Sequence, residues 1–341
     1  MKYATALLAA ASAALAQQFP IRLGGVNTAG YDFTVTTNGS FSGTGATPPS
    51  YEYAHFSSEG ANLYRIPWQL MTPTLGGAIN ESFFEQYDTT VQYALNSSTD
   101  SYIIVDLHNY ARWDGGIIAQ GGPTNEQYAS IWTQLAEKYG TNDRLIFGLM
   151  NEPHDLDIPT WVDSVQYVVS AIRGTGATNY LLLPGSNYTS AQTFPTGAGP
   201  LLAEVTDPLY GNTDKLIFDV HKYLDYDNSG THAECVTNNT VVMEDLVTFL
   251  LQYGGRQAIL SETGGGNTAS CEEYLYEELA YVKSAYPNMV GFSVWAAGAF
   301  DTTYILTVTP NANGTDQPLW IDAGRLYLRS PAVRPNLPPP V

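Results

Sequence analysis

Short apolar stretches with the composition of β-strands recur along the whole chain, and stretches of helical periodicity lie between them. The eight strand-like stretches are Ile21–Asn27, Leu63–Pro67, Tyr102–Leu107, Leu145–Leu149, Tyr180–Pro184, Leu216–Val220, Ala258–Ser261 and Met289–Val294. The clearest helical stretches are Phe83–Leu95, Asn125–Tyr139, Ile158–Ile172, Val241–Tyr253 and Glu272–Ala285. Eight short strands that alternate with helices predict an α/β fold of the (β/α)8, or TIM-barrel, type.

The alternation is weakest between the fifth and sixth strands. Residues 185–208 are rich in Gly, Ser, Thr and Pro, which predicts a long loop with at most a short helix. A hairpin is predicted near residues 33–41. No Ser/Thr/Pro-rich linker divides the chain, and about 325 residues suit one large barrel, so we expect a single domain over residues 17–333.

The N-terminal residues predict export from the cell. Lys2 precedes an apolar run, Ala6–Leu15, and Ala14-Leu15-Ala16 resembles a signal-peptidase site, so residues 1–16 are predicted to be a signal peptide. Six N-x-S/T sequons agree with a secreted, extracellular protein: Asn38, Asn80, Asn96, Asn187, Asn238 and Asn313. Residues 334–341 are proline-rich and predict an extended tail.

The charge of the chain excludes some classes of partner. Its formal net charge is −19, with 14% charged and 44% hydrophobic residues, which is typical of an acidic globular protein. Such a surface repels nucleic acids and acidic lipids, and no other run reaches eighteen apolar residues. We therefore expect a neutral or cationic substrate, no nucleic acid or membrane partner, and a monomer.

The two cysteines, Cys235 and Cys271, are an even number in a chain predicted to be secreted. They predict one disulfide, which would close a loop of about 36 residues. A two-cysteine metal site is the alternative, but the closely spaced His or Cys partners that zinc needs are missing.

Two glutamates stand where apolar stretches end. Leu145–Met150 is followed by Asn151-Glu152-Pro153, and proline ends a strand because it cannot donate to the ladder. Ala258–Ser261 is followed by Glu262-Thr263 and then by three glycines, which we interpret as a turn. Two carboxylates at strand ends are the minimum needed to cleave a glycosidic bond.

A barrel places its active groups at the C-terminal tips of its strands, so polar residues should collect there. They do, on six of the predicted strands: Arg65-Ile-Pro67, Asp106-Leu-His108-Asn109-Tyr110, Asn151-Glu152, His221-Lys-Tyr223, Glu262 and Trp295.

The whole set of motifs resembles family 5 of the glycoside hydrolases, and within it the fungal endo-β-1,4-glucanases. The matching stretches, in chain order, are Arg65–Pro67, Asp106–Trp113, Asn151–Asp155, Asp219–Asp225, Leu260–Asn267 and Trp295–Asp301. One departure is Val294, where many members have glycine before a tryptophan that is often followed by a cis peptide bond. The separate cellulose-binding module of many fungal members is also missing from this sequence, which favours action on soluble or amorphous glucan.

The resemblance implies a role for each matching residue. Glu152 matches the acid/base and Glu262 the nucleophile of a retaining, double-displacement hydrolysis of internal β-1,4-glucosidic bonds. Arg65 and Tyr223 match groups that keep the nucleophile ionised, and Asn151 matches the residue that binds the sugar 2-hydroxyl. His108 and His221 match polar groups of the central subsite. Trp295 matches the platform under the reacting sugar, and Asn109 and Trp113 are further supporting or sugar-contact candidates. No metal or organic cofactor is implied.

Elementary chemistry sets requirements on the same two glutamates. A general acid must keep its proton near the working pH, so Glu152 is expected in an apolar, partly desolvated place. The nucleophile must be charged at that pH, which Arg65 and a tyrosine hydroxyl would favour.

Three alternatives stay open at this stage. Barrels with the same two glutamates also cleave mannan, xyloglucan or mixed-linkage glucan, since the subsite loops decide the substrate. A non-catalytic carbohydrate-binding protein on the same barrel is the second. A metal-dependent hydrolase is the third, although His108 lacks a His-x-His or HExxH companion.

Overall fold

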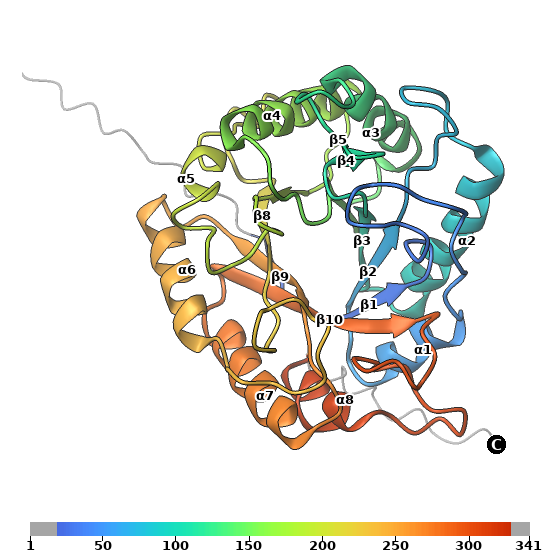
Figure 1. The fold of residues 1–341 in the computed structure, drawn as a ribbon, viewed down its shortest axis with the longest axis vertical. Coiled ribbons are helices and arrows are strands. Elements are labelled where there is room, and N and C mark those ends of the chain that lie inside the picture. The colour runs from blue at the N-terminus through green and yellow to red at the C-terminus, as the bar shows by residue number, and fades with distance from the viewer. Residues whose placement is uncertain (1–18, 329–341) are drawn as a thin grey trace, which may run out of the picture.

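The computed structural model describes residues 19–328, and its centre is a closed barrel of eight parallel strands (Figure 1). The barrel strands are β1 (Leu23–Ala29), β2 (Leu63–Trp68), β3 (Tyr102–Leu107), β6 (Leu145–Gly148), β7 (Leu181–Pro184), β8 (Leu216–His221), β9 (Ala258–Thr263) and β10 (Met289–Gly298). Their order around the barrel is β1-β10-β9-β8-β7-β6-β3-β2, so each strand pairs with its neighbour in the chain and the last closes on the first. The predicted (β/α)8 barrel is confirmed.

Helices form a ring outside the strands (Figure 1). They are α1 (Tyr51–Ser58), α2 (Glu81–Ser97), α3 (Asn125–Tyr139), α4 (Ile158–Gly174), α5 (Gly199–Leu202), α6 (Thr240–Gln252), α7 (Ala269–Ser284) and α8 (Pro318–Asp322), with a 3-10 helix η1 at Gly324–Tyr327. The five predicted helices correspond to α2, α3, α4, α6 and α7, and α5 is the only helix within residues 185–208. The sequence analysis did not predict α1, α8 and η1.

Local sequence signals fix where the main helices begin. Thr124 and Gln127 form a capping box at the start of α3, Asp157 caps α4 through the Thr160 amide, and Thr268 caps α7 through the Cys271 amide. Each cap satisfies an amide that the first helical turn leaves without a partner.

The bottom of the barrel is filled by apolar side chains. Each strand contributes one residue to a single buried cluster: Leu23, Leu63, Ile104, Ile146, Leu182, Ile217, Ile259 and Val290. Residues from all eight strands can meet only inside the barrel, so this layer is its floor. Strand side chains alternate between two faces, so the next inward-facing residue lies two positions toward the C-terminus of each strand. On four strands this residue is polar: Arg65, Asp106, Asp219 and Ser261. A polar layer thus lies above the floor, at the C-terminal end of the strands.

Smaller features complete the fold. The predicted hairpin near residues 33–41 appears as one antiparallel bridge between Val35 and Phe41. A two-stranded sheet, β4 (Arg112–Trp113) with β5 (Gly116–Ile117), occupies the connection between β3 and α3 and was not predicted. Within residues 19–328, no helix has the length and apolar character that crossing a bilayer requires. The predicted signal peptide and tail lie outside the described residues.

Candidate active site

Glu262 lies at the tip of β9 with a separate donor on each carboxylate oxygen. Arg65 Nη1 lies 2.5 Å from Oε1, and the Tyr223 hydroxyl donates to Oε2 at 2.6 Å. All three side chains are buried. Hydrogen bonds from a guanidinium and a phenol fix the plane of the carboxylate and favour its ionised form.

Arg65 connects this carboxylate to three neighbouring strands. Its Nη2 donates to Asn151 Oδ1 at 2.6 Å and lies 2.9 Å from Asp106 Oδ1, and its Nη1 donates to Asn27 Oδ1 at 3.0 Å. The guanidinium is completely buried, and the carboxylates of Asp106 and Glu262 compensate its charge. Asp106 therefore supports the barrel mouth.

Glu152 follows β6 and faces Glu262 across the mouth of the barrel. Its backbone has a φ of +45°, a left-handed conformation that is uncommon for a non-glycine residue and concentrates at functional sites. His221 Nδ1 lies 2.8 Å from Glu152 Oε1 and 3.5 Å from Glu262 Oε2, so one imidazole nitrogen contacts both carboxylates. An oxygen of Glu152 lies within 4.8 Å of an oxygen of Glu262.

The charges of the site favour an ionised Glu262. Burial alone would raise the pKa of Glu262, but the positive charges of His221, Arg65 and His108, together with the Tyr223 hydroxyl, lower that pKa to about 2. Burial opposes the charged form of His221, and the adjacent Glu262 and Glu152 outweigh it and raise the His221 pKa. Glu152 is partly buried, with 17% of its side chain exposed, and His221 is its hydrogen-bond partner.

His108 and Asn151 form a hydrogen-bonded pair beside the glutamates. Asn151 Nδ2 lies 3.1 Å from His108 Nε2, and His108 Nδ1 lies 3.0 Å from Asp106 Oδ2. The Asp106 contact raises the His108 pKa against the lowering effect of burial, and it orients the ring. The sequence analysis missed Tyr110, whose hydroxyl lies 3.5 Å from His108 Nε2, although Tyr110 stands in the same strand-tip motif.

Trp295 forms an aromatic wall with residues that follow it in the chain. Its ring stacks on His108 with centroids 5.8 Å apart, and its Nε1 donates to the Tyr304 hydroxyl at 3.1 Å. Tyr304 in turn stacks on Phe300, with centroids 3.9 Å apart. The peptide bond from Trp295 to Ala296 is cis, so the feature common in the resembling family is present here with Val294 before it.

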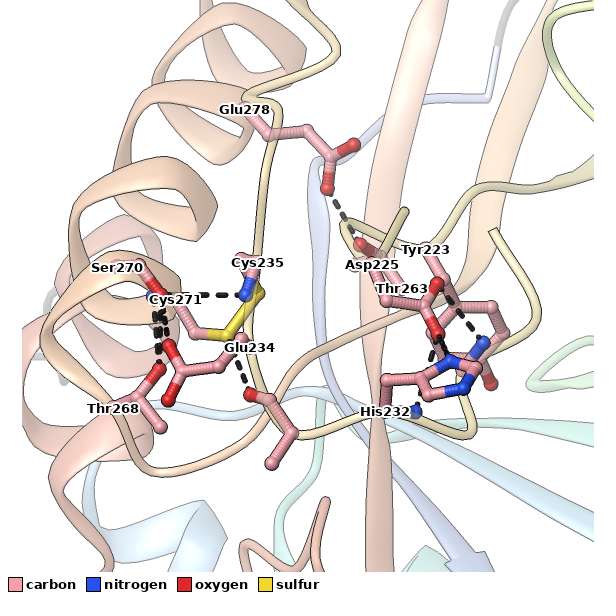
Figure 2. Close-up of a disulfide and its surroundings, with 12 residues drawn as sticks. Tyr223, Asp225, His232, Glu234, Cys235, Thr263, Thr268, Ser270, Cys271 and Glu278 are labelled. Carbon is pink, nitrogen blue, oxygen red and sulfur yellow. Dashed lines mark hydrogen bonds and ion pairs between the residues drawn. A yellow bond between two sulfur atoms is a disulfide. The ribbon is translucent and has the colours of Figure 1, made fainter. Parts of the chain in front are cut away.

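The three glycines after Glu262 are required by packing. None of them has a positive φ, so this stretch does not use the left-handed backbone conformation that glycine allows. A Cβ on Gly264 would lie 2.6 Å from the Trp295 carbonyl oxygen, and one on Gly265 would overlap both sulfurs of the Cys235–Cys271 disulfide. The predicted disulfide is thus confirmed, and Figure 2 shows it bridging α7 and the loop that precedes α6.

Two of the predicted site residues stand apart from this network. Asn109 is fully buried and accepts a hydrogen bond from the Leu70 amide, so it supports the loop after β2. Trp113 is partly exposed on β4 and packs edge-on against Phe41. The analysis also missed Asn27, which lies two residues before the end of β1 and joins Arg65 to the β9 and β10 backbones through Ser261 and Ser293. Its position near a strand tip was the available signal.

Comparison with known proteins identifies the class. The family model described as cellulase (glycosyl hydrolase family 5) matches residues 18–298, and the chain therefore belongs to that family of glycoside hydrolases. Manganese dependent endoglucanase Eg5A from Phanerodontia chrysosporium is 70% identical over 320 residues, 93% of this chain and 80% of that protein. Endoglucanase EG-II from Hypocrea jecorina is 46% identical over 322 residues, 89% of this chain and 75% of that protein.

The solved structures agree. The crystal structure of Cel5A (EG2) from Hypocrea jecorina matches with a TM-score of 0.86 and 44% sequence identity, and the match covers 90% of this chain and 99% of that one. XacCel5A, solved in complex with cellopentaose, matches with a TM-score of 0.81 and 27% identity over 90% of this chain and 99% of that one.

Proposed function

We propose that this chain is a retaining endo-β-1,4-glucanase that hydrolyses internal bonds of cellulose and related β-glucans. The observation that carries the proposal is the pairing of an ionised Glu262, held by Arg65 and Tyr223, with Glu152 whose oxygen lies within 4.8 Å of it. Retaining glycosidases place their two carboxyl groups about 5–5.5 Å apart, whereas inverting enzymes need about 6.5–9.5 Å to admit a water.

In the first step Glu262 attacks the anomeric carbon while Glu152 donates its proton to the glycosidic oxygen. A glycosyl ester on Glu262 forms, the C–O bond to the leaving sugar breaks, and that sugar departs with the proton. The negative charge of Glu262 raises the pKa of His221, whose Nδ1 lies 2.8 Å from Glu152 Oε1.

In the second step the roles of Glu152 reverse. Ester formation removes the charge of Glu262, which favoured the charged form of the adjacent His221. Glu152 then accepts a proton from water as the water attacks the anomeric carbon, and the ester bond breaks with release of Glu262 as a carboxylate. Two inversions at one carbon give net retention.

The surrounding residues bind and orient the sugar. Asn151 has its amide oxygen on Arg65 and its amide nitrogen toward His108, which fixes the side chain for a hydrogen bond to the 2-hydroxyl. Trp295 provides an aromatic face for the reacting sugar ring, and the uncharged glucan suits the acidic chain.

The preferred polysaccharide of this enzyme is found by comparing its rates on different substrates. Several relatives are named endoglucanases, which favours cellulose-like glucan over mannan or xyloglucan. Rates on carboxymethyl cellulose, barley mixed-linkage glucan, xyloglucan and mannan decide the matter. Fast cleavage of mannan with none on cellulose would overturn the assignment.

The deciding experiment follows viscosity and reducing ends of carboxymethyl cellulose with the wild type and Glu262→Gln. An early fall in viscosity indicates internal cleavage. The amide keeps the shape of the carboxylate but cannot form the ester, so we expect the variant to lose several orders of magnitude in rate while staying folded. A folded wild type that leaves all four polysaccharides intact would instead favour a carbohydrate-binding protein.

One relative is named a manganese dependent endoglucanase, so we asked whether any residues of this chain could bind a manganese ion. Within residues 19–328, three groups of His, Asp and Glu bring three ligand atoms together: Glu152 with His221 and Glu262, Asp225 with Asp227 and His232, and His55 with Glu59 and Asp316. An ion in the first group would hold both carboxylates that the reaction needs free. In the third group the guanidinium of Arg325 lies 3.0 Å from Glu59 and 3.6 Å from Asp316, where it repels a cation.

The second group is engaged by its own loop. Asp225 Oδ2 accepts hydrogen bonds from the backbone amides of Thr231 and His232 and lies 3.1 Å from His232 Nδ1. Mn²⁺ prefers several free oxygen or imidazole ligands in an octahedral arrangement. None of the three groups fits a resident manganese ion, and no step of the proposed mechanism uses one.

The setting of the enzyme is inferred from the same residues. The disulfide, the predicted signal peptide and five exposed sequon asparagines, with Asn238 partly exposed, support secretion of an extracellular protein. The mature chain is a monomer with one catalytic domain over residues 17–333, followed by the proline-rich tail.

A further inference from the structure

Glu278 is a carboxyl group buried on the outer side of the barrel, behind the candidate nucleophile. It lies in α7 on the same face as the buried Cys271, Leu275, Leu279 and Val282, and it has no solvent exposure. Glutamate is rarely buried completely unless partners satisfy it. The partners of Glu278 therefore indicate what it does.

Each oxygen of Glu278 accepts a hydrogen bond from a different part of the site. Oε2 accepts from the Thr263 hydroxyl at 2.5 Å, and Thr263 directly follows Glu262 on β9. Oε1 accepts from Asn239 Nδ2 at 3.0 Å, and the same nitrogen donates to the backbone oxygen of Tyr223 at 3.2 Å. One carboxyl group thus reaches both Glu262 and its phenolic hydrogen-bond donor through one intervening residue each. Figure 2 shows Glu278 directed from α7 toward Thr263.

The charges around Glu278 are few. Burial raises its pKa to about 7, against the lowering effects of the Thr263 and Asn239 hydrogen bonds and of Lys222. Thr263 from β9 and Asn239 from the start of α6 are uncharged, and Lys222 at the end of β8 is the charged group that faces it. At acidic pH the side chain is a neutral acid that acts through hydrogen bonds.

Two links other than Glu278 also hold α7 in place. The Cys235–Cys271 disulfide already ties α7 to the loop before α6, and the neighbouring Glu277 accepts a hydrogen bond from Asn238 Nδ2 at 2.5 Å. These links join the same two segments without touching Thr263 or Tyr223. Only the hydrogen bonds of Glu278 among these contacts lead through Thr263 and Asn239 toward Glu262 and Tyr223.

We propose that Glu278 is a positioning residue that fixes the Glu262 carboxylate and the Tyr223 hydroxyl relative to each other through Thr263 and Asn239. The proposal rests on the proposed function, in which Glu262 is the nucleophile. A small displacement of a reacting group costs up to about 10²-fold in rate, so a lock on the adjacent backbone has a measurable effect on turnover.

The test compares four variants: Glu278→Leu, Glu278→Gln, Thr263→Val and Glu277→Gln. Glu278→Leu removes both hydrogen bonds, and we expect kcat on a soluble cello-oligosaccharide to fall about 10- to 100-fold while KM stays within about threefold. Glu278→Gln keeps an acceptor for Asn239, and the Thr263 hydroxyl can turn to accept from its amide, so this variant should stay within about threefold of wild type. Thr263→Val conserves shape and should lower kcat by a smaller factor.

Glu277→Gln is the matched control for Glu278→Gln, because it makes the same substitution one residue away and weakens only the hydrogen bond between Asn238 and Glu277. We expect its kcat and pH profile to equal those of wild type. In Glu278→Leu the acidic limb of kcat/KM should move to higher pH, since a displaced Tyr223 stabilises the Glu262 anion less well.

A purely structural role for Glu278 would lower the melting temperature and leave kcat and the pH profile of the folded enzyme unchanged. That result for Glu278→Leu and Thr263→Val overturns the proposal. If Glu278→Leu does not fold, Thr263→Val tests the proposal instead. A wild-type kcat in this variant contradicts a positioning role for Glu278 through Thr263. A wild type that is inactive on glucans overturns the proposed function itself, and the positioning role falls with it.

Discussion

Tyr223 donates its hydroxyl to Glu262 Oε2 at 2.6 Å, on the oxygen opposite the one that Arg65 binds. Each nucleophile oxygen therefore has its own donor, one charged and one neutral. The arginine comes from β2 and the tyrosine follows β8, so the carboxylate of β9 is held from both sides of the barrel. A carboxylate held at both oxygens cannot rotate out of the plane from which it attacks.

Tyr223→Phe should lower kcat/KM about 10- to 100-fold, because one oxygen of Glu262 loses its fixed position. The pKa of Glu262 is held near 2 partly by this hydroxyl, so its removal raises that pKa and moves the acidic limb of kcat/KM to higher pH. The measurement is a pH profile on a soluble substrate. Tyr226→Phe, an exposed tyrosine in the same loop, is the control, and an unchanged profile in Tyr223→Phe would contradict the assignment.

Gly265→Ala should destabilise the enzyme, because the new methyl group would overlap both sulfur atoms of the disulfide. Overpacking of this kind costs about 1–3 kcal/mol, and loss of the disulfide itself would cost about 3–4 kcal/mol for a loop of this length. Denaturant unfolding and thiol titration of the folded protein measure both effects. Gly174→Ala is the control, since nothing lies within 4 Å of its added carbon and its φ is not positive. Equal stability of the two variants would refute the packing argument.

Buried Glu52 should make the protein less stable at alkaline pH. Its Oε2 accepts a hydrogen bond from the Gly298 amide, its Oε1 has no hydrogen-bond partner among residues 19–328, and burial raises its pKa to about 8. The folded state therefore holds a proton that the unfolded chain releases near pH 4.5. The resulting stability is present below that pH and is lost as the pH rises through about 8.

Glu52→Gln removes this titration. The melting temperature of the variant, compared with that of wild type, should rise by several degrees between pH 5 and pH 9, since 1 kcal/mol corresponds to roughly 2 °C in a domain of this size. Glu137→Gln, on the exposed side of α3, should show no such trend. A constant difference between Glu52→Gln and wild type over this range would show that Glu52 does not titrate there.

The parts of the molecule that the sequence predicted are those with strong local signals. The apolar stretches locate all eight barrel strands, so strand-tip residues could be assigned to the site, although β6 ends at Gly148 and not at Pro153. The helix α1 has only eight residues, and β4 and β5 have two each, which is too short for periodicity to reveal. The packing role of Gly264 and Gly265 could not be predicted, because their neighbours, Trp295 and the disulfide, come from distant parts of the chain.

Glu278 illustrates a signal that was present in the sequence but not used. With Cys271, Leu275, Leu279 and Val282 it follows the i, i+4, i+7, i+8, i+11 pattern of a buried helical face. A carboxyl group at a core position of an amphipathic helix predicts a buried polar contact. The sequence could not reveal the partner, because Thr263 and Asn239 are joined to Glu278 only by the closed barrel and the packing of α6 and α7.

Removal of divalent metal ions should leave the rate on carboxymethyl cellulose within about twofold of the untreated enzyme. The positive charges that stabilise Glu262 come from His221 and Arg65, so the reaction does not need a cation to hold the nucleophile. The measurement is initial rate after dialysis against a chelator, with and without added Mn²⁺. A large loss that Mn²⁺ restores would contradict this mechanism, and Asp227→Asn would then test whether the ion binds beside Asp225 and His232. Competition by Mn²⁺ at the glutamates would instead appear as inhibition that rises with the concentration of the ion.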